Sequence, residues 1–479
     1  MEYNLTTLQP VLPEIFLLSA ACLILVVDLF LTEKTRLLTY GLSLAALIGT
    51  IAMTQYAAGP AHEIILSGSF VRDPMADVLK TGLLLVTLFA FVYAKDYLRE
   101  LGILRGEYYV LGLFAVLGMM VMISANSFLT VYLGLELLAL CMYALVAFHR
   151  DSKTGAEAAM KYFVLGALAS GMLLYGISMV YGATGQLVLS EVAAVIAAGN
   201  ADQTVLAFGL VFIVIGVGFK FGAVPFHMWV PDVYHGAPTA VTLFLGSAPK
   251  IAAFALAIRL LVDGLGGLFE QWQDMLIILA VLSLAIGNII AIAQTNLKRM
   301  LAYSTISHVG FIFLGLIAGT DKGYSAAMFY AIVYALTAAG GFGVVTMLSR
   351  NGLDAENIHD LKGLNDRSPW LAFMMMLILF SMAGVPPTVG FFAKLFVLDA
   401  VVSIDMVWLA AVAVFFSIIG AFYYLRAVKA MYFDKPIDER PLLSSMDTQV
   451  AMSINGLAIL AFGLFPAALL TACRTAFGI

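Results

Sequence analysis

The chain has 479 residues, of which 62% are hydrophobic and 11% are charged, with a formal net charge of −5. Soluble domains hold about 45–50% apolar and about 25% charged residues, so this composition excludes a soluble protein and predicts a polytopic membrane protein. The three cysteines are widely spaced and the six histidines form no ligand pattern. Nothing in the sequence therefore indicates a zinc, haem or iron–sulfur centre.

Apolar segments follow one another along almost the whole chain. A spanning helix needs about 20 apolar residues, and the sequence contains fourteen such segments without a stretch that reads as a soluble domain. We therefore predict an all-α polytopic membrane protein with helices at 10–31, 37–56, 75–94, 109–124, 127–149, 158–182, 205–228, 238–262, 273–294, 301–318, 324–348, 370–402, 405–430 and 450–474.

Basic residues are distributed unevenly between the predicted loops. If the N-terminus lies outside, the inner loops hold sixteen of the 25 Lys and Arg residues and the outer segments hold three. Inner loops are enriched in Lys and Arg. The pattern therefore predicts fourteen helices with both termini on the outer side.

A weak internal repeat relates the two halves of the chain. The sequence Ala-Val-Pro at 223–225, in helix 7, resembles Gly-Val-Pro at 384–386, in helix 12. The two helices run in opposite directions, which is typical of inverted repeats in secondary transporters. We predict a single membrane domain with helices 1–3 at 1–105, a first five-helix repeat at 106–265, a second at 270–432 and a last helix at 445–479.

Four charged residues lie inside apolar segments: Glu136, Lys220, Lys250 and Lys394. At 1.5 Å per residue, the first three lie about 14, 22 and 18 Å into their helices, near the membrane midplane. A charge there costs roughly 2.5–3.5 kcal/mol, and such residues generally mark ion or proton pathways. We predict a proton relay. The alternative is a static ion pair between Glu136 and Lys220 that holds helices together.

Prolines interrupt helices 7 and 12 beside two of these lysines. Pro225 lacks an N–H, so the carbonyl of Phe221 loses its helical partner, and Pro386 and Pro387 do the same in helix 12. Freed carbonyls at membrane depth require water or protein to satisfy them. Two matched breaks, each near a lysine, favour wet positions on a proton path over simple kinks.

Weaker candidates complete the predicted site. Lys161 lies near the inner start of helix 6, where snorkelling to the interface explains it, although it could link Glu136 to the other charges. His227 and His308 could relay protons because histidine titrates near neutrality, and a role in helix packing is equally compatible. We expect Lys80 and Arg259 to be interfacial.

Four further motifs are specific enough to compare with known families: GVGFKFGAVPFHMWVPDVYHGAPTAVTLFL (216–245), LGLELLAL (133–140), LAYSTISHVGF (301–311) and GVPPTVGFFAKL (384–395). They resemble the antiporter-like subunits of respiratory complex I, over nearly the whole chain. Among these subunits, PEIFLL near the start and fourteen predicted helices look most like the bacterial subunit N family, whereas subunit M usually has glutamate at the position of Lys394.

The resemblance implies a proton-translocating membrane subunit of NADH:quinone oxidoreductase in the bacterial inner membrane, with both termini periplasmic. Glu136 would pair with Lys220, Lys250 would be the central relay and Lys394 the terminal site, with Lys161 in support. No cofactor is expected on this chain. NADH, FMN, iron–sulfur clusters and quinone would belong to partner subunits, and the other partners are membrane subunits, the peripheral arm and lipids, but no nucleic acid.

Three other readings remain open. An Mrp-type cation/proton antiporter or membrane-bound hydrogenase subunit shares the pattern of helices 5, 7, 8 and 12, and neighbouring genes for NADH- and quinone-binding subunits would discriminate against it. A self-sufficient transporter for a small solute predicts transport by the isolated chain. A purely structural subunit predicts that Lys250→Ala leaves turnover and pumping intact.

Overall fold

The computed structural model describes residues 8–349, 355–436 and 444–479. Within these ranges, thirteen helical segments are long and apolar enough to cross a membrane. The first of them joins a 3₁₀ turn, Gln9–Val11, to α1. With that turn included, eleven of the thirteen are continuous helices: α1 (Leu12–Asp28), α2 (Leu37–Ala57), α3 (Pro74–Glu100), α4 (Gly106–Ile123), α5 (Phe128–Val146), α6 (Lys153–Thr184), α8 (Gln203–Phe221), α13 (Leu297–Ile317), α14 (Asp321–Leu348), α18 (Val407–Phe433) and α19 (Met446–Leu464).

The other two long segments contain irregular turns. One comprises α10 (Thr239–Gly246), α11 (Ala248–Ala257) and a π-helical turn (Ile258–Gly264), with Ser247 interrupting the helix. The other is α12 (Phe269–Ala293), preceded by a 3₁₀ turn at Gly266–Leu268.

The predicted helix 12 is present as two shorter pieces, α16 (Pro369–Ala383) and α17 (Val389–Val402). Neither piece alone is long enough to count as a span, which is why the structure yields thirteen long segments where the sequence predicted fourteen. Helix 7, predicted at 205–228, is interrupted as well: α8 ends at Phe221, and a separate short helix, α9 (Trp229–Gly236), follows the break. The predicted breaks in helices 7 and 12 are thus confirmed, and each contains a cis X-Pro bond, Val224–Pro225 and Pro386–Pro387.

Several features were not predicted. The last predicted helix, 450–474, was wrong as one continuous element, because the chain turns at Phe465 and Pro466 and separates α19 from α20 (Ala467–Thr475). A two-stranded antiparallel sheet pairs Glu63 with Arg72. The remaining short elements are β1 (Glu63–Ile65), β2 (Phe70–Arg72), α7 (Leu189–Ala197), a 3₁₀ turn (Ile358–Leu361) and α15 (Leu364–Arg367).

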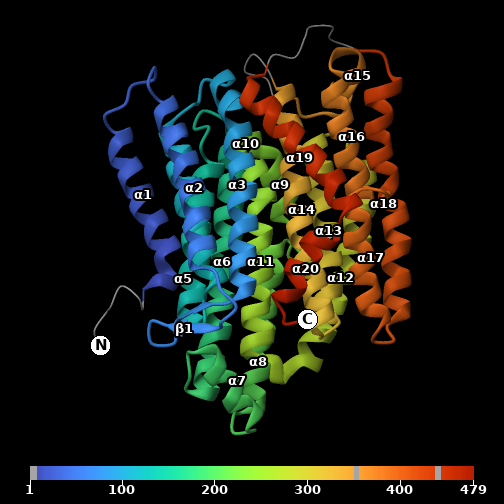
Figure 1. Cartoon of the computed structure of the whole chain (residues 1–479). Coiled ribbons are helices and arrows are strands. Elements are labelled where there is room, and N and C mark those ends of the chain that lie inside the picture. The colour runs from blue at the N-terminus through green and yellow to red at the C-terminus, as the bar shows by residue number, and fades with distance from the viewer. Residues whose placement is uncertain (1–7, 350–354, 437–443) are drawn as a thin grey trace.

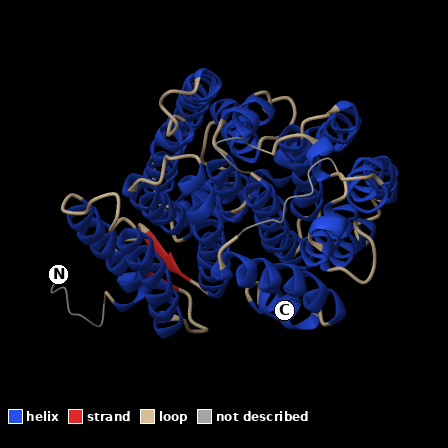
Figure 2. Ribbon diagram, turned by 90° about the horizontal axis from the view of Figure 1, so that it is seen from above, coloured by secondary structure: helices blue, strands red, loops and turns tan. Residues whose placement is uncertain are grey.

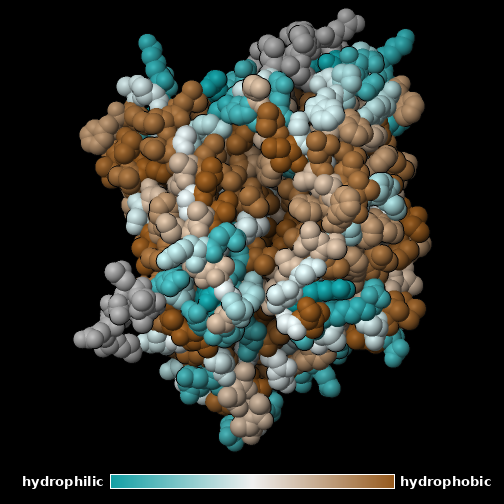
Figure 3. Space-filling model, in the orientation of Figure 1, coloured by the Kyte–Doolittle hydropathy of each residue, from teal (hydrophilic) through white to brown (hydrophobic). Residues whose placement is uncertain are grey.

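The long helices run side by side and many are seen end-on in Figure 2, while Figure 1 shows the start of α1 and the short helix α20 toward the same end of the bundle. Hydrophobic side chains form a broad band across the face in Figure 3, between more hydrophilic ends, as a membrane-embedded surface requires. The most enclosed segments are Thr239–Gly264 and Leu297–Ile317, each 94% buried over its apolar window. These segments carry Lys250 and His308, so two candidate site residues lie in the interior.

Candidate proton-relay site

The first helix break places a lysine on a freed carbonyl. α8 ends at Phe221, where Gly222 adopts a left-handed conformation (φ +77°) that suits glycine. Pro225 cannot donate to the Phe221 carbonyl. Instead, the Lys250 ammonium on α11 donates to that carbonyl at 2.7 Å. The backbone N–H of Val224 is satisfied separately by the Ser283 hydroxyl at 2.9 Å.

Lys220 and Lys250 share a small cavity beside this break. Lys250 is 2% exposed, and its Nζ lies 5.8 Å from the centre of the Trp229 ring. The cavity measures about 30 Å³ and is lined by both lysines, Trp229 and Tyr162, with apolar side chains around them. One water needs about 10–15 Å³ of such volume. The cavity that both lysines line therefore has room for about two waters.

Glu136, on α5, makes no direct ion pair with Lys220. In the described ranges, the two side chains do not come within the 4.0 Å that defines a salt bridge. The nearest polar partner of Lys220 is the Ser170 hydroxyl at 3.4 Å. One carboxylate oxygen of Glu136 is buried without a hydrogen-bond partner among the described residues. The interpretation as a static, directly bonded pair is thus wrong for this conformation.

At the second break a lysine again binds a carbonyl that a proline has freed, and here the lysine and the carbonyl belong to the two pieces of one interrupted helix. α16 ends at Ala383, followed by Gly384 at φ +86° and by the two prolines. Lys394, on α17, donates to the Ala383 carbonyl at 2.8 Å and to the Ser417 hydroxyl at 2.8 Å. Its Nζ also lies 5.1 Å from the centre of the Phe311 ring. Both predicted breaks therefore have a carbonyl bound by a lysine.

His308 lies between hydroxyl groups close to the second break. Its Nδ1 is 2.7 Å from the Tyr330 hydroxyl, and its Nε2 is 3.1 Å from the Tyr424 hydroxyl. A cavity of about 10 Å³, close to the size of one water, is lined by His308, Tyr330 and residues of α16 and α17 such as Ser381 and Ala393. The structure thus places His308 next to the segment that carries Lys394.

Hydroxyls on α13 extend this polar region. Ser304 hydrogen-bonds Tyr424, and Thr305 accepts from Tyr334 at 2.7 Å. These tyrosines were not among the predicted site residues. Tyr330 and Tyr334 are one helical turn apart on α14, so their i, i+4 spacing in an apolar segment was the available signal.

Two weaker candidates lie elsewhere. His227 lies in the loop between α8 and α9, and its Nδ1 is buried without a partner in the described part of the chain. The Lys161 side chain is 42% exposed and binds Glu157 and Asp232, each at 2.8 Å. Lys161 does not line the cavity between Lys220 and Lys250. The structure therefore does not bring Lys161 into the lysine cavity.

The interfacial position of Lys80 and Arg259 stays a prediction, but both side chains are buried in ion pairs. Lys80 is 1% exposed and binds Glu14, on α1, at 2.6 Å. Arg259 is 3% exposed and binds Asp73 at 2.8 Å and Asp263 at 3.0 Å. Buried charges need partners of opposite sign, and here the partners for both basic residues come partly from distant segments.

Comparisons with known proteins identify the family and the fold of the chain. Residues 125–420 match the family described as NADH:quinone oxidoreductase/Mrp antiporter, TM. The chain is 60% identical to NADH-quinone oxidoreductase subunit N of Thioalkalivibrio sulfidiphilus, covering 98% of each chain. It is similar to a chain of respiratory complex I from Thermus thermophilus, with 30% identity, 96% and 98% coverage and a TM-score of 0.83. A chain of the Mrp complex from Dietzia sp. shares the fold, with a TM-score of 0.84, 21% identity and coverage of 99% and 97%.

Proposed function

This chain belongs to the NADH:quinone oxidoreductase/Mrp antiporter family, among its subunit N members, and we propose that it moves protons through the lysines at its two helix breaks. It is a proton-translocating membrane subunit of complex I, a multi-pass protein of the bacterial inner membrane that assembles with other membrane subunits. The uneven distribution of basic residues supports placing both termini on the periplasmic side.

The observation that carries the proposal is the cavity shared by Lys220 and Lys250. Two lysines that line one cavity with room for about two waters can exchange a proton through that water. One carboxylate oxygen of Glu136 is buried without a hydrogen-bond partner among the described residues. If Glu136 moves toward Lys220, this oxygen can accept a hydrogen bond from the ammonium group and so favour a proton on Lys220. Glu136 thus acts as a switch that changes the proton affinity of Lys220.

From Lys250 the proposed route continues along α13 toward Lys394. The hydroxyls of Thr305 and Tyr334 are hydrogen-bonded to each other, and His308 binds two further tyrosines. A histidine can accept a proton on one ring nitrogen and release one from the other. Its water-sized cavity reaches the segment that carries Lys394, the terminal site of the relay. His227 and Lys161 have supporting roles at the first break and at the helix ends.

The driving energy must come from several coupled steps. Moving one charge against 100 mV takes about 2.3 kcal/mol. Changing one ion-pair distance by a few Å, at an effective dielectric constant near 20, changes the energy by roughly 1–2 kcal/mol. A chain of charged residues perturbed by quinone reduction elsewhere in the complex therefore fits better than one switch. We propose that NADH, FMN, iron–sulfur clusters and quinone bind to partner subunits, with no cofactor on this chain.

The test replaces Lys250 by methionine, which keeps a long side chain but removes the proton carrier. In membranes with the complex assembled, NADH:quinone turnover and proton uptake should both fall about tenfold or more, since each 1.36 kcal/mol added to a barrier slows a step tenfold. Lys322→Met is the control, because Lys322 is 43% exposed and binds Asp399 away from the cavity. Normal turnover and pumping in Lys250→Met would refute the relay.

A further inference from the structure

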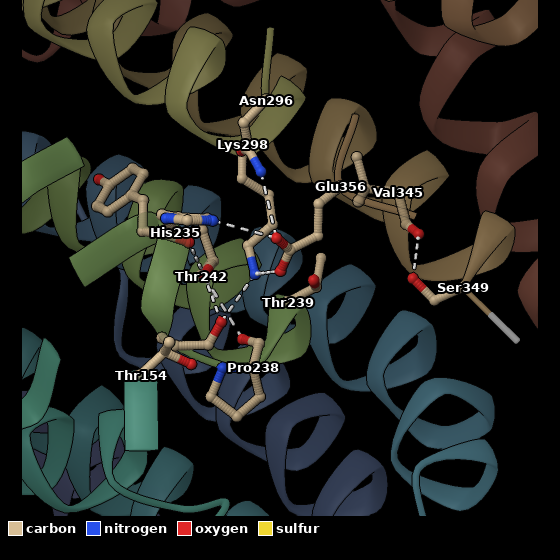
Figure 4. A network of polar contacts seen from close by, with 12 residues as sticks. Thr154, His235, Pro238, Thr239, Thr242, Asn296, Lys298, Val345, Ser349 and Glu356 are labelled. Atoms are coloured by element: carbon tan, nitrogen blue, oxygen red, sulfur yellow. Dashed lines mark hydrogen bonds and ion pairs between the residues drawn. The ribbon is translucent and has the colours of Figure 1, made fainter. Parts of the chain in front are cut away.

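The carboxylate of Glu356, in the segment between α14 and α15, is bound by three side chains (Figure 4). Lys298 on α13 lies at 3.0 Å, His235 on α9 at 3.2 Å, and the Asn296 amide donates at 3.2 Å. The backbone is fixed as well, because the N–H of Leu297 donates to the Glu356 carbonyl at 2.5 Å. The chain at Glu356 is thus attached to the start of α13.

Lys298 connects this segment to the junction between α9 and α10. Its side chain is 1% exposed, and its Nζ donates to the Ala237 carbonyl at 2.9 Å in addition to binding Glu356. Ala237 directly follows α9. A positive charge is favourable at the C-terminal end of a helix, where carbonyls lack partners. Lys298 therefore holds the end of α9, and Glu356 holds Lys298.

A second ion-pair cluster lies about one turn earlier on α9. Asp232 binds Arg299 of α13 at 2.8 Å and Lys161 of α6 at 2.8 Å, and Lys161 also binds Glu157. Among the described residues, the ion pairs around Asp232 and His235 of α9 thus include Lys161, Arg299 and Glu356, with Glu157 and Lys298 bound to these partners in turn.

α9 has eight residues, too few for a helix that is stable on its own, so its position depends on these contacts. Its first residue, Trp229, lines the cavity between the two lysines and lies 5.8 Å from the Lys250 Nζ. The Trp229 indole also donates to the Phe219 carbonyl at 3.2 Å, next to Lys220. A shift of α9 would therefore change the surroundings of both lysines.

We propose that Glu356, acting through Lys298 and His235, is a positioning residue that fixes α9 and thereby holds Trp229 against the lysine cavity. The expected effect on proton transfer rests on the proposed relay, whereas the positioning of α9 does not. Glu356 touches neither relay lysine in the structure. Its influence passes through α9, which links the contacts of Glu356 to the first helix break.

The test is Glu356→Gln in the assembled complex, because glutamine keeps the size and removes the charge. Hydrogen exchange of the α9 amides should become about tenfold faster, since local opening depends on the contacts that hold a short element. NADH:quinone turnover should fall several-fold, and Glu356→Asp should restore part of both. Glu270→Gln is the matched control, because Glu270 is an exposed residue at the start of α12.

The outcomes separate this inference from the proposed function. Unchanged exchange of α9 in Glu356→Gln would overturn the positioning role, whatever the turnover. Faster exchange with normal turnover and pumping would also overturn it, because α9 would then be held for stability alone. If Lys250→Met pumps normally, the relay fails, and the exchange result still reports whether Glu356 fixes α9.

Discussion

Filling the cavity between Lys220 and Lys250 should stop proton exchange without changing either lysine. Ala253, on α11, lines this cavity. Replacing it with valine adds two carbon atoms. The cavity of about 30 Å³ has room for about two waters, so the added atoms match the number of waters. The valine methyl groups would therefore displace the water through which the two amines exchange a proton.

The size of the effect follows from the lost hydrogen bonds. A hydrogen bond to a charged group contributes about 1.5–3 kcal/mol, and each 1.36 kcal/mol of barrier is a factor of ten in rate. Removing one water contact from the proton in transit should therefore slow transfer roughly ten- to hundredfold. The cost to folding should be small, because the added carbons occupy space that is already empty.

The assay is NADH:quinone turnover together with proton uptake in membranes, after a native gel has confirmed assembly. Ala252→Val is the control, because Ala252 is fully buried on the same helix but does not line the cavity. It reports the general effect of added volume, which by itself costs about 1–3 kcal/mol of stability. Normal turnover and uptake in assembled Ala253→Val would refute a water-mediated step between the lysines.

Two further predictions concern the second break and the inner end. At Gly463 an added Cβ would overlap the carbonyl oxygen of Pro387, so Gly463→Ala should lower the thermal stability of the complex, measured by melting of the purified assembly. For Glu356, burial opposes ionisation, but hydrogen bonds and charges from His235 and Lys298 outweigh it and lower the pKa from 4.5 to about 2. Because the pKa is lower in the folded protein, the ionised carboxylate stabilises the folded state at pH values above the pKa of the unfolded chain, by on the order of 3 kcal/mol. Hydrogen exchange at several pH values should therefore show the Glu356-dependent protection of α9 unchanged from neutrality to pH 4.5 and lost as the pH falls toward 2; loss near neutrality would contradict this.

The fold was predictable because a membrane imposes simple rules on a sequence. Long apolar segments must form helices, since the bilayer offers no partners for a free backbone, and proline identifies where helices 7 and 12 break. The break between α19 and α20 also contains a proline, Pro466, but it lies inside an apolar run that reads as one helix. The hairpin that contains Arg72 lies in a loop without a strong strand pattern.

The contacts at the site were less predictable, because they depend on how helices rotate and pack. The sequence indicated that the Phe221 carbonyl loses its partner, but not that Lys250, from another helix, would bind it. It also suggested a pair between Glu136 and Lys220, because both lie near the midplane. Equal depth does not make two side chains face each other, and in the structure they do not form an ion pair.

The two lysine-bound carbonyls explain why each break needs its lysine. A buried ammonium without an acceptor is costly, and so is a buried carbonyl without a donor. At both breaks these two groups satisfy each other, at 2.7 Å for Lys250 and 2.8 Å for Lys394. A continuous helix would leave the lysine without this acceptor, and a break without the lysine would leave the carbonyl to water alone. A water-sized cavity lies close to each break: Lys250 lines the first, and Ala393, the residue before Lys394, lines the second. Each break therefore combines a carbonyl, the lysine that satisfies it and a nearby space for water, which are the parts that a proton path needs inside a membrane.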